Sequence, residues 1–207
     1  MGQSVTQRTL ALIPLSSDPA SKDRLLLTIQ GRSVLEWTVD AMRMVPEIGD
    51  VVIAEPASNR LLTLRQALDS APVADRILFH EPNRPLTSAA GLRSFLRDAA
   101  AHPAAAMVVP VKSTYKEVVD GRVVSTMPRN QLYQLQHVLV VDRAPFEEAL
   151  DSTIRQGRVD GDEFTACQSA GIPIQLIPGS YFNFPIAAHL DVEFAEIALV
   201  KGLRLAP

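Results

Sequence analysis

The sequence predicts an α/β fold, a Rossmann-like three-layer sandwich with a mostly parallel sheet and a protruding β-hairpin arm. Short apolar segments alternate with amphipathic ones along most of the chain, which is typical of a parallel sheet covered by helices on both faces. The alternation is interrupted once, by two strand-like segments that flank Asp120-Gly121, a dipeptide that favours a two-residue hairpin turn.

The first half of the chain follows a strand, helix, strand order. Leu10 to Leu15 is a short apolar run that ends at a Ser-Ser-Asp-Pro loop, as a buried strand does. Ser33 and Glu36 form a capping box, which predicts a helix ending near Pro46. The same periodicities then predict strands at 50–54, 76–79 and 106–110, and helices at 59–68 and 88–101.

The second half contains the arm, which we place at about residues 111–133, with strands 114–119 and 122–126. An isolated hairpin is marginally stable in water, so we expect the arm to pack against a second copy and make a homodimer. The remaining patterns predict strands at 134–141 and 174–177 and helices at 145–156, 162–170 and 192–201.

The composition limits the classes of protein that fit. A chain of 207 residues with 47% hydrophobic residues builds one sizeable core, so we interpret residues 1–207 as a single domain. A net charge of -3 without long runs of like charge argues against nucleic-acid and membrane partners. Cys167 is the one cysteine, which excludes a disulfide scaffold and favours a cytoplasmic location.

A series of short motifs resembles one family in the same order. Leu12-Ile13-Pro14 is followed by Phe79 to Pro85, which is similar to a His-Asp-Ala-Ala-Arg-Pro motif and keeps its histidine, arginine and final proline. Residues 109–116 are similar to Pro-Val-x-Asp-Thr-x-Lys, and residues 128–132 to Asp-Arg-x-x-Leu. From Leu10 to Lys201 the chain therefore resembles the 2-C-methyl-D-erythritol 4-phosphate cytidylyltransferases, as a divergent member of this family with the nucleotide-diphospho-sugar transferase, GT-A-like fold.

This resemblance implies a nucleotidyltransferase domain that converts CTP and methylerythritol phosphate to CDP-methylerythritol and pyrophosphate, in isoprenoid biosynthesis. An acceptor phosphate oxygen attacks the α-phosphorus in line, and cations stabilise the negative charge that develops. The resemblance also implies Mg²⁺ as cofactor, and a nucleotide and a sugar-alcohol phosphate as small-molecule partners.

The nucleotide half of the implied site is altered. The family's glycine-rich loop corresponds to residues 16–24, which contain no glycine, so the backbone has lost its freedom to approach phosphate oxygens. Arg24 aligns with a catalytic lysine, and Lys22 lies two residues away as a substitute; an ordinary solvated loop cation is equally expected for either. Ser16, Ser17 and Glu81 are the expected nucleotide-binding residues, and Glu81 is the expected metal ligand.

Two further family positions are changed near the end of the chain. Phe182 and Pro185 stand where the resemblance implies an aspartate and a second lysine, whereas Asn183 is kept. The stretch before His80 is also shorter than in the family, so the segment that reads the cytosine and ribose is expected to be missing.

The acceptor half is better preserved. Thr114, Lys116 and Arg129 match arm residues that grip the acceptor phosphate in the family, and Arg129 is also a predicted catalytic residue. A guanidinium and a hydroxyl suit a phosphate dianion, although exposed arm residues without a role have the same pattern. Arg84 is a further candidate substrate-binding residue, with bracing of its own loop as the alternative.

The sequence leaves three functions open. The first is a cytidylyltransferase of low activity, since several groups that act on the transition state are altered. The second is a catalytically inactive paralogue that serves as a dimeric binding or regulatory protein. The third is a nucleotidyltransferase with another substrate, because sheets of this kind host many transfers.

Overall fold

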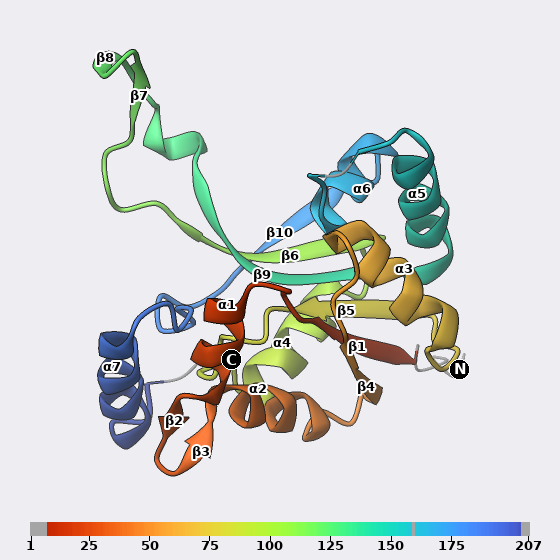
Figure 1. Cartoon of the computed structure of the whole chain (residues 1–207), viewed down its shortest axis with the longest axis horizontal. Coiled ribbons are helices and arrows are strands. Elements are labelled where there is room, and N and C mark those ends of the chain that lie inside the picture. Colours follow the sequence, from red (N-terminus) through yellow and green to blue (C-terminus); the bar gives the residue numbers. More distant parts are fainter. Residues whose placement is uncertain (1–7, 159, 204–207) are drawn as a thin grey trace.

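The computed structural model describes residues 8–158 and 160–203, and its centre is a six-stranded sheet in the order β10-β6-β9-β5-β1-β4 (Figure 1). β9 runs antiparallel to both of its neighbours, β5 and β6, whereas the other neighbouring pairs are parallel. The predicted mostly parallel sheet is thus confirmed. Its strands are β1 (Thr9–Pro14), β4 (Ile48–Ala54), β5 (Arg76–His80), β6 (Ala104–Pro110), β9 (Tyr133–Asp142) and β10 (Ile174–Pro178).

Helices cover both faces of the sheet, because the buried strands are apolar on both sides. In β1, Leu10 and Leu12 belong to one core, and Ala11 and Ile13 belong to the other. This alternation follows from the twofold periodicity of a strand. The first core is covered by α3 (Arg60–Ser70), α5 (Arg143–Arg155) and α6 (Glu163–Ser169), and the second by α2 (Val34–Arg43) and α4 (Ala89–Ala99). The predicted three-layer α/β class is confirmed.

A third apolar cluster lies beside the sheet and joins an early segment of the chain to its last helix. It packs the inner face of α7 (His189–Val200) against Leu25 of α1 (Pro19–Leu26) and Ile29 of a short hairpin. That hairpin pairs β2 (Thr28–Ile29) with β3 (Arg32–Ser33). Neither α1 nor this hairpin follows from the apolar periodicity, since Leu25 is the one buried residue of α1.

The arm leaves the body of the protein as a hairpin of β7 (Lys116–Val119) and β8 (Arg122–Thr126), followed by the 3₁₀ turn η1 (Arg129–Gln131) (Figure 1). Asp120 and Gly121 have φ angles of 47° and 75°, as the predicted hairpin turn requires. All residues of β7 and β8 are exposed.

The base of the arm is fixed to the body by Tyr181. Its hydroxyl donates to the carbonyl of Pro110 at 2.6 Å, and the Lys112 ammonium lies 3.5 Å from the centre of its ring. The arm therefore has a defined root although its tip is solvent-exposed. Across the described ranges, none of the helices has the length and apolarity needed to span a bilayer.

Candidate active site

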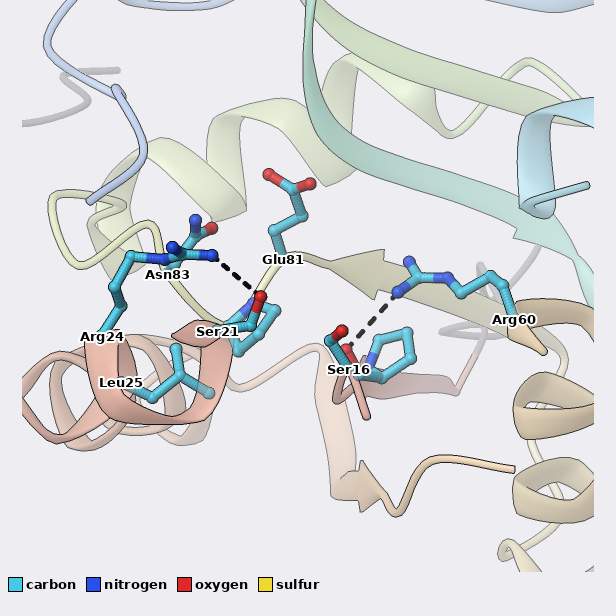
Figure 2. A pocket seen from close by; sticks show the side chains of 9 residues that line it. Ser16, Ser21, Arg24, Leu25, Arg60, Glu81 and Asn83 are labelled. Atoms are coloured by element: carbon cyan, nitrogen blue, oxygen red, sulfur yellow. Dashed lines mark hydrogen bonds between the residues drawn. The ribbon is translucent and has the colours of Figure 1, made fainter. Parts of the chain in front are cut away.

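A cavity of about 130 Å³ opens at the carboxyl ends of the parallel strands β1 and β5 (Figure 2). This is the edge of an α/β sheet where ligands bind, because loops rather than strand backbone line the space there. Pro14 ends β1, and Glu81 directly follows β5. The lining residues are Pro14, Ser16, Ser21, Arg24, Leu25, Arg60, Glu81, Pro82 and Asn83.

The loop expected before Arg24 is a helix in the structure, and Asp18 explains why. Its carboxylate accepts hydrogen bonds from the backbone N–H groups of Ala20 and Ser21, at 3.3 and 3.0 Å, and from the Ser21 hydroxyl at 2.8 Å. Pro19 occupies the first helical turn, where it needs no donor. The Ser21 hydroxyl, with the two N–H groups and Arg24, holds the pKa of Asp18 below its usual value.

The same contacts change the anion chemistry of the loop. In a glycine-rich loop the free backbone N–H groups are the donors to phosphate. Here the amides of Ala20 and Ser21 already have an anionic acceptor from within the chain. These two amides are therefore not available to a phosphate, which leaves side chains such as Arg24 to attract one.

Arg24, and not Lys22, lies at the cavity. Its Nη2 donates to the Ser21 hydroxyl at 2.9 Å and lies 3.7 Å from the Asp18 carboxylate. Lys22 does not line the cavity. Of the two cations that the alignment offered, the helix thus turns Arg24 towards the space.

Glu81 contributes one carboxylate to the cavity. Its Oε2 accepts a hydrogen bond from Nε of Arg84 at 2.8 Å, and its Oε1 lies 3.6 Å from Nδ1 of His137. No group of three His, Cys, Asp or Glu side chains that would hold a metal gathers anywhere in residues 8–158 and 160–203. A metal at this place would have Glu81 as its protein ligand and would need substrate oxygens for the rest. Mg²⁺ binds in this way, with one or two carboxylates, water and phosphate.

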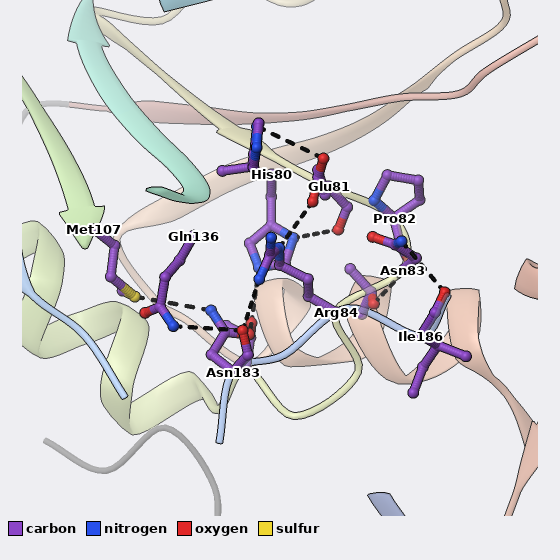
Figure 3. A network of polar contacts seen from close by, with 12 residues as sticks. His80, Glu81, Pro82, Asn83, Arg84, Met107, Gln136, Asn183 and Ile186 are labelled. Atoms are coloured by element: carbon purple, nitrogen blue, oxygen red, sulfur yellow. Dashed lines mark hydrogen bonds and ion pairs between the residues drawn. The ribbon is translucent and has the colours of Figure 1, made fainter. Parts of the chain in front are cut away.

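Arg84 is buried beneath the cavity, in the network of Figure 3. Besides Glu81, its guanidinium binds the carbonyl of Asn183, to which Nη1 donates at 2.7 Å. Burial lowers the pKa of Arg84, and the Glu81 carboxylate opposes that shift. Arg84 is thus a brace between two loops, and its side chain does not line the cavity.

His80 belongs to the same network and is fully buried. Burial lowers the pKa of its imidazole from 6.5 to about 3, so the ring is neutral at pH 7. Nδ1 donates to the carbonyl of Glu81 at 2.6 Å, and Nε2 lies 2.8 Å from the Thr87 hydroxyl. The Thr87 hydroxyl also lies 3.0 Å from Oδ1 of Asn183. His80 therefore supports the backbone that carries Glu81.

The residue that sequence reasoning missed is Arg60, at the start of α3. Its Nε and Nη2 donate to both carboxylate oxygens of Glu163, at 3.1 and 2.9 Å. Nη1 donates to the carbonyl of Pro14 at 3.4 Å. No local pattern identifies this pair, because its two residues are 103 positions apart in the chain.

Comparisons with known proteins decide the family. The family model described as 2-C-methyl-D-erythritol 4-phosphate cytidylyltransferase matches residues 57–201. The chain belongs to this family. The 2-C-methyl-D-erythritol 4-phosphate cytidylyltransferase of Halalkalibacterium halodurans is 31% identical over 128 residues, which span 62% of this chain and 56% of that protein. That of Desulforamulus reducens is 28% identical over 203 residues, which span 84% and 87% of the two chains.

The fold agrees with that of a solved cytidylyltransferase. The crystal structure of the enzyme from Thermus thermophilus aligns with a TM-score of 0.76 and 25% sequence identity, over 92% of this chain and 98% of that one. Sheet, covering helices and chain order are therefore those of a methylerythritol phosphate cytidylyltransferase. The family model begins at residue 57, so the altered segment of residues 16–24 lies outside the part it matches.

The remaining nucleotide-binding candidate from the sequence, Ser17, lies at a second cavity. Ser17 lines a space of about 170 Å³ beside the first, and Ser16 and Arg60 line both. This second space extends between the β1 loop and the start of α3, where Asn59 and Thr63 add polar groups. The two cavities share one wall, so Ser16 and Arg60 lie at the junction.

Apart from Arg84, the candidate acceptor residues all lie on the arm. Thr114, Lys116 and Arg129 are exposed, and none of them lines either cavity. Lys116 donates to the Thr126 hydroxyl across the hairpin at 2.7 Å. The structure thus brings together Ser16, Arg24 and Glu81, and leaves the arm residues apart from them.

Proposed function

We propose that this chain is a cytidylyltransferase that joins CTP and methylerythritol phosphate to give CDP-methylerythritol and pyrophosphate, in isoprenoid biosynthesis. One observation carries the proposal: in a chain of this family, the cavity at the ends of β1 and β5 is lined by both a guanidinium, Arg24, and a carboxylate, Glu81 (Figure 2). A cation for phosphate oxygens and a carboxylate for a metal are what this transfer needs.

In this reaction the residues bind and orient, and the substrates react. The acceptor phosphate oxygen forms a bond to the α-phosphorus of CTP, while the bond from that phosphorus to the bridging oxygen breaks and pyrophosphate leaves with its electrons. Arg24 attracts the phosphate oxygens, and Arg84 fixes the Glu81 carboxylate in place. A bound Mg²⁺ would supply charge neutralisation of the phosphates, with Glu81 as its protein ligand.

The acceptor side of the proposal needs a homodimer formed through the arm. Val118, Val119, Val123 and Val124 are each more than half exposed on a hairpin whose residues are all exposed. Pairing of two arms would cover these side chains, as is expected of a hairpin that is marginal alone. It would also bring Thr114, Lys116 and Arg129 of one copy towards the cavity of the other.

The proposed activity is low. The backbone N–H groups after Asp18 are occupied, and Phe182 and Pro185 offer no charge. Removing one donor that acts on a transition state lowers kcat by about 10² to 10³. The proposed location is the cytoplasm, in agreement with a single cysteine, Cys167, which can form no disulfide within the chain.

The test is a pyrophosphate-release assay with CTP, Mg²⁺ and methylerythritol phosphate, on the full chain and on Arg24→Gln. We expect release from the full chain, and a rate at least about tenfold lower from the variant, because a charge-assisted phosphate contact is lost. Lys22→Gln removes a neighbouring cation outside the cavity and serves as the matched control. No release above that of the buffer at saturating CTP would refute the proposal.

A second candidate function is favoured by the Asp18 contacts. A carboxylate that occupies the loop donors excludes a phosphate from them, as expected of an inactive paralogue that binds other molecules as a dimer. Calorimetric titration with Mg²⁺-CTP and the pyrophosphate-release assay together separate the candidates, since an inactive paralogue releases no pyrophosphate whether or not it binds the nucleotide. Heat with UTP, ATP or GTP in place of CTP would support a nucleotidyltransferase with another substrate.

A further inference from the structure

The Arg60 side chain is placed and directed in a way that an ordinary surface arginine of α3 does not need. It begins the helix at the wall shared by both cavities, and Figure 2 shows its guanidinium directed into the first one, from the side opposite Arg24. Its side chain is 28% exposed, so Arg60 is not closed off from solvent.

Glu163 holds this guanidinium in one orientation. Both of its carboxylate oxygens are used, at 2.9 and 3.1 Å, and its side chain is 2% exposed. A bidentate pair fixes the plane of a guanidinium. It consumes Nε and Nη2 and leaves Nη1, whose hydrogen bond to the Pro14 carbonyl is long at 3.4 Å. The edge of Arg60 with donors to spare is thus the one at the cavity.

The charged groups that line the first cavity also suit an anion, because Asp18 and Glu163, the carboxylates paired with its two guanidinium groups, do not line it. Arg24 and Arg60 line it together with one carboxylate, Glu81, and that carboxylate is paired with the buried Arg84. Two guanidinium groups therefore face the space from opposite sides, with hydroxyl groups of Ser16 and Ser21 between them (Figure 2). Arginine suits this task because its planar donors match phosphate oxygens.

We infer that Arg60, oriented by Glu163, is a phosphate-binding residue that grips the polyphosphate chain of the nucleotide opposite Arg24. This inference rests on the proposed function for the identity of the ligand, and it assigns to a side chain on α3 the role that the glycine-free loop cannot fill. Glu163 acts through Arg60 and is a positioning residue.

A purely structural role would give Arg60 a different signature. An ion pair that only ties α3 to α6 would lower stability when broken, and would leave anion binding unchanged in the molecules that remain folded. Arg65 supplies the matched control, because it lies on the same helix and pairs with Asp69, Glu147 and Asp151 but lines neither cavity.

The experiment measures binding of inorganic tripolyphosphate by calorimetry to the full chain, Arg60→Gln and Arg65→Gln, with thermal unfolding of each. We expect Arg60→Gln to weaken binding about 10- to 100-fold, as for the loss of one or two charge-assisted hydrogen bonds, and Arg65→Gln to bind within about twofold of the full chain. Unchanged affinity in Arg60→Gln, equal losses in both variants, or no binding by the full chain would each overturn the inference.

Two further measurements keep the result interpretable. If Arg60→Gln does not fold, the double variant Arg60→Gln with Glu163→Gln removes both charges and leaves no unpaired buried carboxylate. Its loss of tripolyphosphate binding supports the inference, and its retention of binding refutes it. Arg60-dependent binding by a protein that releases no pyrophosphate from CTP would sink the proposed function and uphold this inference.

Discussion

At the scale of single residues, His80 shows how the cavity is supported from below. The imidazole is buried and neutral, and its Nδ1 donates to the carbonyl of Glu81, the residue whose side chain lines the cavity. A charged imidazole would need solvation that this site cannot give. The position of Glu81 therefore depends on His80 remaining neutral.

This dependence predicts a loss of stability in mild acid. The pKa of His80 is about 3 in the folded chain and 6.5 in the unfolded one, so below pH 6.5 the unfolded chain binds a proton that the folded chain does not. The free energy of unfolding then falls as the pH falls, by about 2 kcal/mol between about pH 6.5 and pH 5. Urea unfolding at pH 7 and pH 5 measures it.

The comparison is between His80→Gln and His189→Gln. The first variant is expected to lose about 2 kcal/mol less than the wild-type chain over this pH interval, because the titrating group is gone. His189 is exposed, so its replacement should leave the pH dependence as it was. Equal pH slopes in all three proteins would contradict the assignment.

Residue-scale prediction from the sequence reached Arg24 and Glu81 but not Arg60. The first two follow from motifs read along the chain. Arg60 acquires its place from contact with Glu163, and no spacing rule connects residues so far apart. The sequence could not decide which of Arg24 and Lys22 lies at the cavity. The answer depends on which side of α1 faces that space, and the apolar pattern does not predict α1.

At the scale of elements, α1 is the departure that matters most for function. Residues that look unfavourable to a phosphate loop, Asp18 and Pro19, are favourable to a helix start. They convert a segment that would wrap a ligand into one that satisfies its own donors. The sequence also did not predict that β9 runs antiparallel to its neighbours, because a strand buried on both faces has the same apolar pattern in either direction.

Two substitutions of Asp18, the cap of α1, are expected to affect anion binding and stability separately. Asp18→Asn keeps a capping acceptor and removes a negative charge beside Arg24, so tripolyphosphate should bind more tightly than to the wild-type chain. Asp18→Ala removes the cap and should lower the melting temperature by about 2 to 4 °C. Calorimetry and thermal unfolding follow the two effects. Weaker binding by Asp18→Asn would show that the carboxylate does not compete with the ligand.

At the scale of the whole molecule, the arm exposes apolar side chains that contacts within one chain do not cover. Its hairpin was predictable from Asp120-Gly121, and its register pairs Val118 directly with Val123. Both side chains are more than half exposed. No local sequence pattern identifies a partner that would cover these side chains. The hairpin could therefore be predicted from the sequence, whereas the dimer stays an expectation.

A double substitution, Val118→Lys with Val123→Lys, tests that expectation. Charged side chains at the centre of an arm interface should give a monomer by sedimentation equilibrium and reduce pyrophosphate release, while the melting temperature of the monomer changes little because these positions are already exposed. Glu117→Gln, in the same hairpin, should remain dimeric. A dimer that survives both lysines would exclude the arm as the interface.

The network of Figure 3 carries one more consequence. His80, Arg84 and Asn183, three residues on which the resemblance to the family rests, are at most 4% exposed and hold two loops together. Similarity scores reward such positions for reasons of architecture, whatever happens at the phosphate loop. A genome survey that assigns isoprenoid synthesis from these motifs would therefore detect the fold and not the activity. The side chains at positions 18, 24 and 60 are better markers of the activity.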